Sequence, residues 1–196
     1  MLTKSIIENL LILAGESFWV AGNFAQLHKL LLTHNKRGLS AANQTLNAAG
    51  NIAWICYFGT NHLWLPFVSN LAMFGMTATI VAILLTNKRQ FFSGITAISF
   101  LGPITGFVIV AYPNSAGWLG VAFNFIAASP WVLHVVRTKK TSGISERSLM
   151  LAWSAMTCTL IYGFLVHSAP LVVGCLIGIT YNIIIAVYYY RYRHVH

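Results

Sequence analysis

The sequence predicts an all-α integral membrane protein with seven transmembrane helices in a 3+1+3 arrangement, its N-terminus outside and its C-terminus in the cytoplasm. Composition, the alternation of apolar runs with polar breaks, and an internal repeat predict this fold. Hydrophobic residues make up 57% of the 196 positions and charged residues only 8%, which excludes a soluble domain of this size. Because lipid cannot satisfy free backbone groups, the apolar runs are expected to be helices of about 20 residues or more.

Apolar runs between polar breaks predict the individual spans. These spans lie at 6–32, 41–60, 64–85, 93–112, 115–136, 145–166 and 169–190. The first run carries Glu8 and Glu16 and is longer than the apolar core of a signal peptide, so it is expected to remain as a span.

Lysine and arginine residues indicate the orientation and check the number of spans. Of the 12 basic residues, all but Lys4 lie at the helix ends that a seven-span path places on one side. The positive-inside rule makes that side cytoplasmic. One helix more or fewer would break this alternation. The basic residues that give the net charge of +9 are therefore expected to contact anionic lipid headgroups, and no nucleic-acid partner is expected.

An internal repeat appears when the loop after the first span is overlaid on the loop after the fifth. The segment 37–40, Arg-Gly-Leu-Ser, lies over 142–145, Ser-Gly-Ile-Ser, at a spacing of 105 residues. The same spacing pairs His62 with His167, and a spacing of 104 pairs Pro66 with Pro170. The chance matches expected in a hydrophobic chain are the alternative, but a shared Gly-Leu/Ile-Ser motif in the same loop favours a true repeat.

The repeat predicts the domain organisation. Residues 1–87 form the first three-helix repeat, 88–114 the linker helix, and 115–196 the second three-helix repeat with a short cytoplasmic tail. Three spans reverse the direction of the chain, so the linker returns the second repeat to the orientation of the first. Parallel repeats about an axis along the membrane normal are found in transporters, with a site at the repeat interface.

Two polar stripes run along the first and second predicted helices. Their members recur at spacings of three and four, which places each set on one helix face. The sets are Glu16, Trp19, Asn23 and Gln26, and Gln44, Asn47, Asn51 and Trp54. Because polar groups in a span tend to face protein or water, the stripes are expected to line a water-filled cavity. Interhelical hydrogen bonding is the alternative.

The loop motifs resemble those of the SWEET sugar facilitators of the PQ-loop superfamily, over essentially the whole chain. The matching segments are Gln26, 36–40 and 54–57 in the first half, and 128–130, 137–139 and 141–145 in the second. The resemblance implies a seven-helix 3+1+3 fold that moves a small solute by alternating access. It also implies that Trp54 flanks the sugar, with Thr159 where the sixth helix of the family has a second tryptophan. Asn70 matches an asparagine of the third helix, and Leu171 or Val172 stands at the corresponding place in the seventh.

These patterns predict the solute-binding residues. Hydrogen bonds are expected mostly from asparagines, and apolar or stacking contact from three further residues. The full set is Asn23, Asn51, Trp54, Asn70, Asn124, Met156 and Thr159. The second half is less polar than the first, so the N-terminal repeat is expected to carry most of the chemistry.

Glu16, Pro130 and Gln26 are predicted to serve coupling and gating. A charge at the centre of a span costs ~2.5–3.5 kcal/mol on insertion scales, which protonation of Glu16 would avoid, so Glu16 is a candidate proton site. A position near the outer surface or a polar partner is the alternative. Pro130 lies about two turns from the cytoplasmic end of its span and is predicted to be the hinge of an inner gate that Gln26 faces; a static kink is the alternative.

Other function classes find little support in the sequence. It shows no catalytic set, metal-ligand cluster or phosphate loop, and its three cysteines, Cys56, Cys158 and Cys175, are unpaired in spacing. An enzyme, a metal and a cofactor are therefore not expected. The expected partners are a small-molecule solute and the lipid bilayer. A homo-oligomer is compatible with the fold but not required by it.

The leading hypothesis is a carrier for a small neutral polar solute, with sugar first. A proton-coupled amino-acid carrier of the PQ-loop type and a cargo receptor resembling the KDEL receptor are the alternatives. The short cytoplasmic tail favours the plasma (inner) membrane over an organelle membrane.

Overall fold

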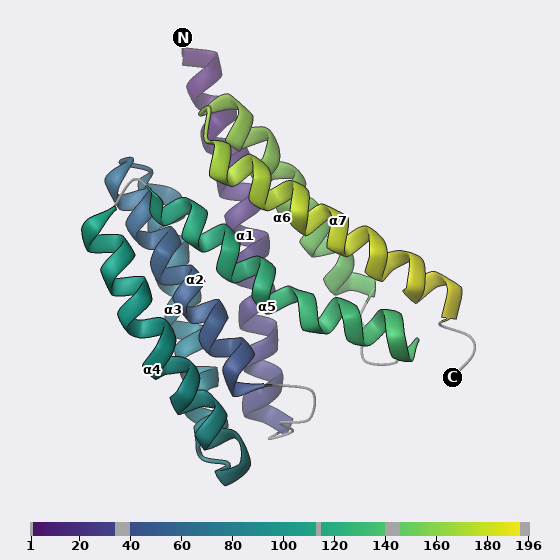
Figure 1. Cartoon of the computed structure of the whole chain (residues 1–196). Helices are drawn as coiled ribbons and strands as arrows, with labels where there is room; N and C mark the ends of the chain where they lie inside the picture. The colour runs from purple at the N-terminus through teal and green to yellow at the C-terminus, as the bar shows by residue number, and fades with distance from the viewer. Residues whose placement is uncertain (1, 34–39, 113–114, 140–145, 193–196) are drawn as a thin grey trace. The chain divides into compact units, whose positions relative to one another are not determined.

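The computed structural model describes residues 2–33, 40–112, 115–139 and 146–192, and these residues form seven helices (Figure 1). The helices are α1 (Leu2–Thr33), α2 (Ala41–Thr60), α3 (Trp64–Leu85), α4 (Lys88–Ala111), α5 (Ala116–Thr138), α6 (Glu146–Leu165) and α7 (Ala169–Tyr192). The predicted spans 41–60 and 64–85 coincide with α2 and α3, and the other predicted ends differ by a few residues. The predicted number and order of helices is confirmed for the described residues.

Five of the helices are long and apolar enough to cross a membrane on their own. They are α1 over Ile6–Leu32, α3, α4 over Phe91–Ala111, α5 over Ala116–Arg137, and α7. The apolar part of α6 is shorter, Leu149–Leu165. The apolar character of α2 is interrupted by its polar stripe, but Gln44 and Thr45 on this helix are buried. Burial of these polar groups inside the protein is what a span of this composition requires.

Helix boundaries recur at a spacing of 105 residues. α2 and α6 begin and end 105 residues apart, α3 and α7 begin 105 residues apart, and α1 and α5 end 105 residues apart. The middle helix has 20 residues in each half, whereas α1 and α5 have 32 and 23 residues and α3 and α7 have 22 and 24. In this register Pro66 is the third residue of α3 and Pro170 the second of α7. Both lie in a first turn, where the missing N–H of proline removes no helical hydrogen bond.

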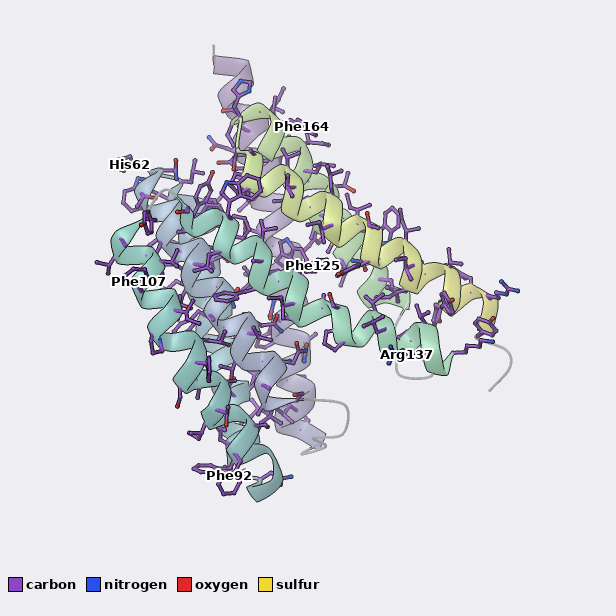
Figure 2. All side chains as sticks on the ribbon, in the orientation of Figure 1. His62, Phe92, Phe107, Phe125, Arg137 and Phe164 are labelled. Carbon is purple, nitrogen blue, oxygen red and sulfur yellow. The ribbon has the colours of Figure 1, made fainter. Side chains whose placement is uncertain are left out.

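The turns that connect α2 to α3 and α6 to α7 also have the same backbone geometry. His62 and His167 both adopt positive φ, 56° and 54°. The His62 N–H donates to the Gly59 carbonyl at 3.2 Å, and the His167 N–H donates to the Phe164 carbonyl at 3.3 Å. Figure 2 shows His62 at the α2–α3 turn and Phe164 at the end of α6. The loop repeat seen in the sequence thus extends to the conformation of these turns.

The helices divide into two compact units. Unit 1 comprises Met1–Gly22 and Phe125–His196, and unit 2 comprises Asn23–Asn124. α1 and α5 each contribute their first part to one unit and the rest to the other. Each sequence repeat thus supplies helices to both units, and the division at 1–87, 88–114 and 115–196 stays a prediction about the repeat.

Each unit has its own packed core. In unit 2, α2 packs against α3 and α4, which lie side by side in Figure 1; its core cluster contains Leu30, Ala41, Ile80 and Leu84. In unit 1, α6 packs against α7, and its cluster contains Val132, Leu149 and Ile185. The outward side of α4 is apolar and exposed, with Phe92 and Phe107 projecting from it (Figure 2). Such a surface is suited to lipid.

Candidate functional site

Trp54 is the centre of an aromatic cluster on α2 in unit 2. Its side chain is buried, with 7% of its surface exposed. The indole stacks on Phe58 with ring centroids 5.4 Å apart and meets the edge of Tyr57 at 5.7 Å. The first part of α5 covers the ring at Gly120, where an added Cβ would lie 2.8 Å from Trp54 Cε2 and Nε1. Glycine therefore permits α5 to lie directly against the indole.

Asn51 lies about one helical turn before Trp54 on α2, and Asn124 lies about one turn after Gly120 on α5. Asn51 Nδ2 donates to Thr77 Oγ1 on α3 at 3.4 Å. Asn124 Oδ1 lies 2.8 Å from where a Cβ on Gly50 would stand, so α5 and α2 are also close at this point. The structure thus brings two of the predicted solute-binding residues, Trp54 and Asn124, to one α2–α5 crossing, and places the Asn51 amide against α3.

Other predicted residues of unit 2 are placed differently. Asn70 is buried on α3, and its Nδ2 donates to the Pro66 carbonyl of the same helix at 2.9 Å. Asn23 is half-buried and Gln26 is exposed, both on the second part of α1. The side-chain hydrogen bond of Asn70 stays within α3, and Gln26 lies on α1. Their roles in binding and gating stay predictions.

Unit 1 contains the same kind of crossing with different side chains. Thr159 on α6 is buried, and its Oγ1 donates to the Ala155 carbonyl at 2.9 Å. A Cβ added to Gly15 on α1 would lie 2.9 Å from Thr159 Oγ1. Gly15 precedes Gly120 by 105 residues, and Trp54 precedes Thr159 by 105. Each crossing therefore places a glycine from the first helix of one repeat against the second helix of the other repeat.

An acidic side chain lies next to this second crossing. Glu16 follows Gly15 on α1 and is 5% exposed, and Cys175 on α7 of the same unit is also buried. The residues 105 positions away from Glu16 and Cys175 are Val121 and Asn70. The carboxyl of Glu16 in unit 1 thus corresponds to the apolar Val121 in unit 2. In the same way, the hydroxyl of Thr159 corresponds to the indole of Trp54, and the thiol of Cys175 to the amide of Asn70.

The helix starts give a second match for Asn70 in α7. α3 begins at Trp64 and α7 at Ala169, and this spacing of 105 residues pairs Asn70 with Cys175. The match of Asn70 to Leu171 or Val172, made by resemblance, stays a prediction.

Sequence reasoning missed Asn182, a buried polar residue of α7. Its Nδ2 donates to Met156 Sδ on α6 at 3.4 Å and to the Gly178 carbonyl at 3.0 Å. Met156, a predicted solute-binding residue, is half-buried and packs closely on Gly178. Two signals could have identified Asn182: an amide within an apolar run, and its spacing of 105 residues from Thr77.

Pro130 lies at an exposed position of α5 and directly follows Ser129, which takes part in a polar contact between α5 and α7. Ser129 Oγ donates to the Phe125 carbonyl at 2.7 Å and lies 2.7 Å from the Tyr181 hydroxyl. Since the serine proton is used by the carbonyl, the tyrosine is the donor in the second bond. The rings of Phe125 and Tyr181 stack at 5.6 Å. Pro130 belongs to unit 1 and Gln26 to unit 2, and the gate between them stays a prediction.

Over residues 2–33, 40–112, 115–139 and 146–192, no group of three or more His, Cys, Asp or Glu side chains could hold a metal ion. The three cysteines are free thiols on different helices.

Comparison with solved structures identifies the fold. The chain is similar to the structure of a eukaryotic SWEET transporter, with a TM-score of 0.78 over 97% of this chain and 99% of that chain, at 10% sequence identity. No protein-family model and no curated protein matches the sequence. At this identity the likeness shows the fold alone. Together with the apolar helices, it describes an integral, multi-pass membrane protein with a SWEET-like fold.

Proposed function

We propose that this chain is a transmembrane carrier that moves a small neutral polar solute, with sugar as the first candidate, by alternating access. The observation that carries the proposal is the α2–α5 crossing of unit 2. There a buried tryptophan and Asn124 lie at one crossing, with Asn51 one helical turn before the tryptophan on α2. An indole with nearby amides suits a sugar, whose ring has an apolar face and hydroxyl edges. The SWEET-like fold supports it, because the solved neighbour is described as a transporter.

The proposed carrier keeps the orientation expected from the basic residues, with the N-terminus outside, in the plasma membrane. The two three-helix repeats are proposed to run parallel about an axis along the membrane normal. The recurrence of helix boundaries and of the two histidine turns at 105 residues supports two copies of one unit. Alternating access through paired repeats is a common transporter mechanism.

Glu16 favours a second candidate, a proton-coupled carrier of the amino-acid type. Its side chain is 5% exposed on a helix long enough to span the membrane. A carboxyl in such a place can take up and release a proton at a lower cost than it can remain charged. In this version Glu16 would bind the coupling proton and the solute would bind elsewhere.

Uptake into proteoliposomes separates these proposals. The purified chain would be tested with labelled glucose and with a mixture of labelled neutral amino acids, each with and without a pH gradient. Glucose flux that is indifferent to the gradient supports the facilitator. Gradient-driven flux that is lost in Glu16→Gln supports coupling, with Glu8→Gln as the control for removing a carboxyl near the end of the same helix. No flux of any solute, together with tight binding of a peptide, would favour the cargo receptor and refute both carriers.

A further inference from the structure

The ends of α5 and α7 meet at one tyrosine ring within unit 1. Lys139 directly follows α5, and its Nζ lies 5.4 Å from the centre of the Tyr192 ring. Arg191 is in the last turn of α7, and its Cζ lies 5.6 Å from the centre of the same ring. Both helix ends can be followed in Figure 1. Two cations thus converge on one aromatic side chain, and we call Lys139, Arg191 and Tyr192 the Tyr192 cluster.

Packing of the two helices holds this meeting point in place. Val136 on α5 and Tyr189 on α7 both pack against the core cluster of unit 1. Val136 is three residues before Lys139, and Tyr189 is three residues before Tyr192. The Lys139 N–H donates to the Val135 carbonyl at 2.9 Å, so the backbone that leaves α5 is itself hydrogen-bonded. The cluster is therefore built on anchored helix ends.

Positive charge exceeds negative charge in the chain segments around the cluster. Residues 137–147 and 191–193 include six Lys and Arg residues and one acidic residue, Glu146. A helix C-terminus favours nearby cations, but that preference does not require two cations to share one ring. Like charges held close together repel each other. Since these segments cannot balance their own charge, an anion from outside the chain would offset the repulsion.

The corresponding hairpin of unit 2 has no such cluster in its sequence. Residues 188–192 read Tyr-Tyr-Tyr-Arg-Tyr, whereas residues 83–87, at the spacing of 105, read Ile-Leu-Leu-Thr-Asn. α3 ends at Leu85 without a basic residue in its last turn. A helix of this hairpin can therefore end without basic and aromatic side chains, and those at the end of α7 require a reason of their own.

The cluster lies where two candidate membrane spans end. α5 over Ala116–Arg137 and α7 over Ala169–Tyr192 are each long and apolar enough to cross a membrane. The ends of such spans reach the membrane surface, where tyrosine rings and basic side chains meet lipid headgroups. Leu133 on α5 and Val187 on α7 are exposed, so the same two helices also offer apolar surface to acyl chains.

We propose that the Tyr192 cluster binds the phosphate group of an anionic phospholipid. The Lys139 ammonium and the Arg191 guanidinium donate charge-assisted hydrogen bonds to phosphate oxygens, and the ring of Tyr192 holds both cations in reach. A choline headgroup carries its own cation beside the phosphate, so the surrounding basic residues favour headgroups without one. This site goes beyond the proposed carrier function and does not depend on the identity of the solute.

Thermal unfolding in a neutral detergent measures this binding. Phosphatidylglycerol should raise the unfolding midpoint of the purified chain, and phosphatidylcholine with the same acyl chains should raise it much less. Lys139→Gln and Arg191→Gln should each weaken the apparent affinity for phosphatidylglycerol roughly tenfold, as expected for the loss of a hydrogen bond to a charged group. Equal shifts with the two lipids would overturn the proposal.

Arg137 provides the matched control for charge. It lies in the last turn of α5, two residues before Lys139, and is exposed (Figure 2). Arg137→Gln removes the same charge from the same helix end and should weaken the affinity only about threefold or less, through long-range attraction. A loss as large as that of Lys139→Gln would indicate a general positive surface and would refute a defined site.

Lys139→Gly separates binding from folding. Lys139 has a φ of 54°, a backbone conformation that glycine adopts more readily than lysine. The midpoint without lipid should therefore stay at or above the native value, while the affinity for phosphatidylglycerol should fall about tenfold. A full response to lipid in this variant would show that Lys139 only ends the helix, and the proposal would fail.

A soluble phosphate compound tests the source of the anion. Glycerol 3-phosphate carries the phosphate without acyl chains, so it should raise the midpoint far less than phosphatidylglycerol does. An equally large shift that is lost in Lys139→Gln would assign the cluster to a soluble phosphate compound and overturn the lipid assignment. Uptake of solute by the native chain has no part in these measurements, so failure of the carrier proposal leaves this test unaffected.

Discussion

Alanine at position 120 would press a methyl group onto the indole of Trp54. The added Cβ would lie 2.8 Å from Cε2 and Nε1 and 3.0 Å from Cδ1. Carbon atoms in favourable contact are about 3.5–4.0 Å apart, so the ring or α5 has to move by about 0.7 Å or more. The ring has little room to do so, because it is buried and stacked on Phe58.

The size of the effect follows from two opposing terms. Inserting a methyl group into a packed contact costs about 1–3 kcal/mol, whereas replacing a helical glycine by alanine contributes roughly 0.5–1 kcal/mol of stability. Gly75 on α3 is the matched control in the same unit, because an added Cβ there meets nothing within 4 Å. Gly120→Ala should therefore be about 1–3 kcal/mol less stable than Gly75→Ala, a difference in unfolding midpoint of roughly 2–12 °C.

Thermal unfolding in detergent measures this difference. If the clash with Trp54 is its cause, Trp54→Ala should remove the penalty of Gly120→Ala, and the two changes will not be additive. Equal midpoints for Gly120→Ala and Gly75→Ala would refute the close α2–α5 packing. Under the proposed function, Gly120→Ala should also raise the KM for glucose, whereas Gly75→Ala should leave it unchanged.

Three further predictions concern the two histidine turns, the hydrogen bond between Ser129 and Tyr181, and the proposed hinge at Pro130. His62→Gly and His167→Gly should each raise the unfolding midpoint, by an amount worth up to about 1 kcal/mol, because both residues have positive φ; a gain at one turn and a loss at the other would contradict their equivalence. Tyr181→Phe should lower stability by about 0.5–1.5 kcal/mol, since it leaves Ser129 Oγ without its donor, and an unchanged midpoint would argue against that bond. Pro130→Ala should slow solute exchange and reduce labelling from the cytoplasmic side, and unchanged rates would exclude the hinge.

The alternation of apolar runs with polar breaks determined the helices of this protein from the sequence alone. Each span is a local property, because lipid forces an apolar run of sufficient length to form a helix. The spans 41–60 and 64–85 could therefore be placed to the residue. The matching loop motif and the paired histidines were also visible in the sequence, and the two histidine turns share a positive φ. The three-helix repeat that they predict stays a prediction.

The candidate site was only partly accessible to sequence reasoning. Sequence reasoning found Trp54, Asn51 and Asn124 because a polar or aromatic side chain within an apolar span can be identified without knowing its contacts. That Gly120 covers Trp54 could not be found in this way, because glycine has no side chain to mark a contact. Asn182 escaped for a different reason: its partner, Met156, is an apolar residue and forms no polar stripe with it.

Tertiary structure alone decided which helices share a site. The sequence repeat groups α1 with α2 and α3, but the packing places the first part of α1 with α6 and the first part of α5 with α2. Such contacts join residues more than 60 positions apart, and their geometry depends on where helix surfaces come close enough to interlock. Close packing is decided by the shapes of both surfaces together, so the pattern of one helix at a time cannot reveal it.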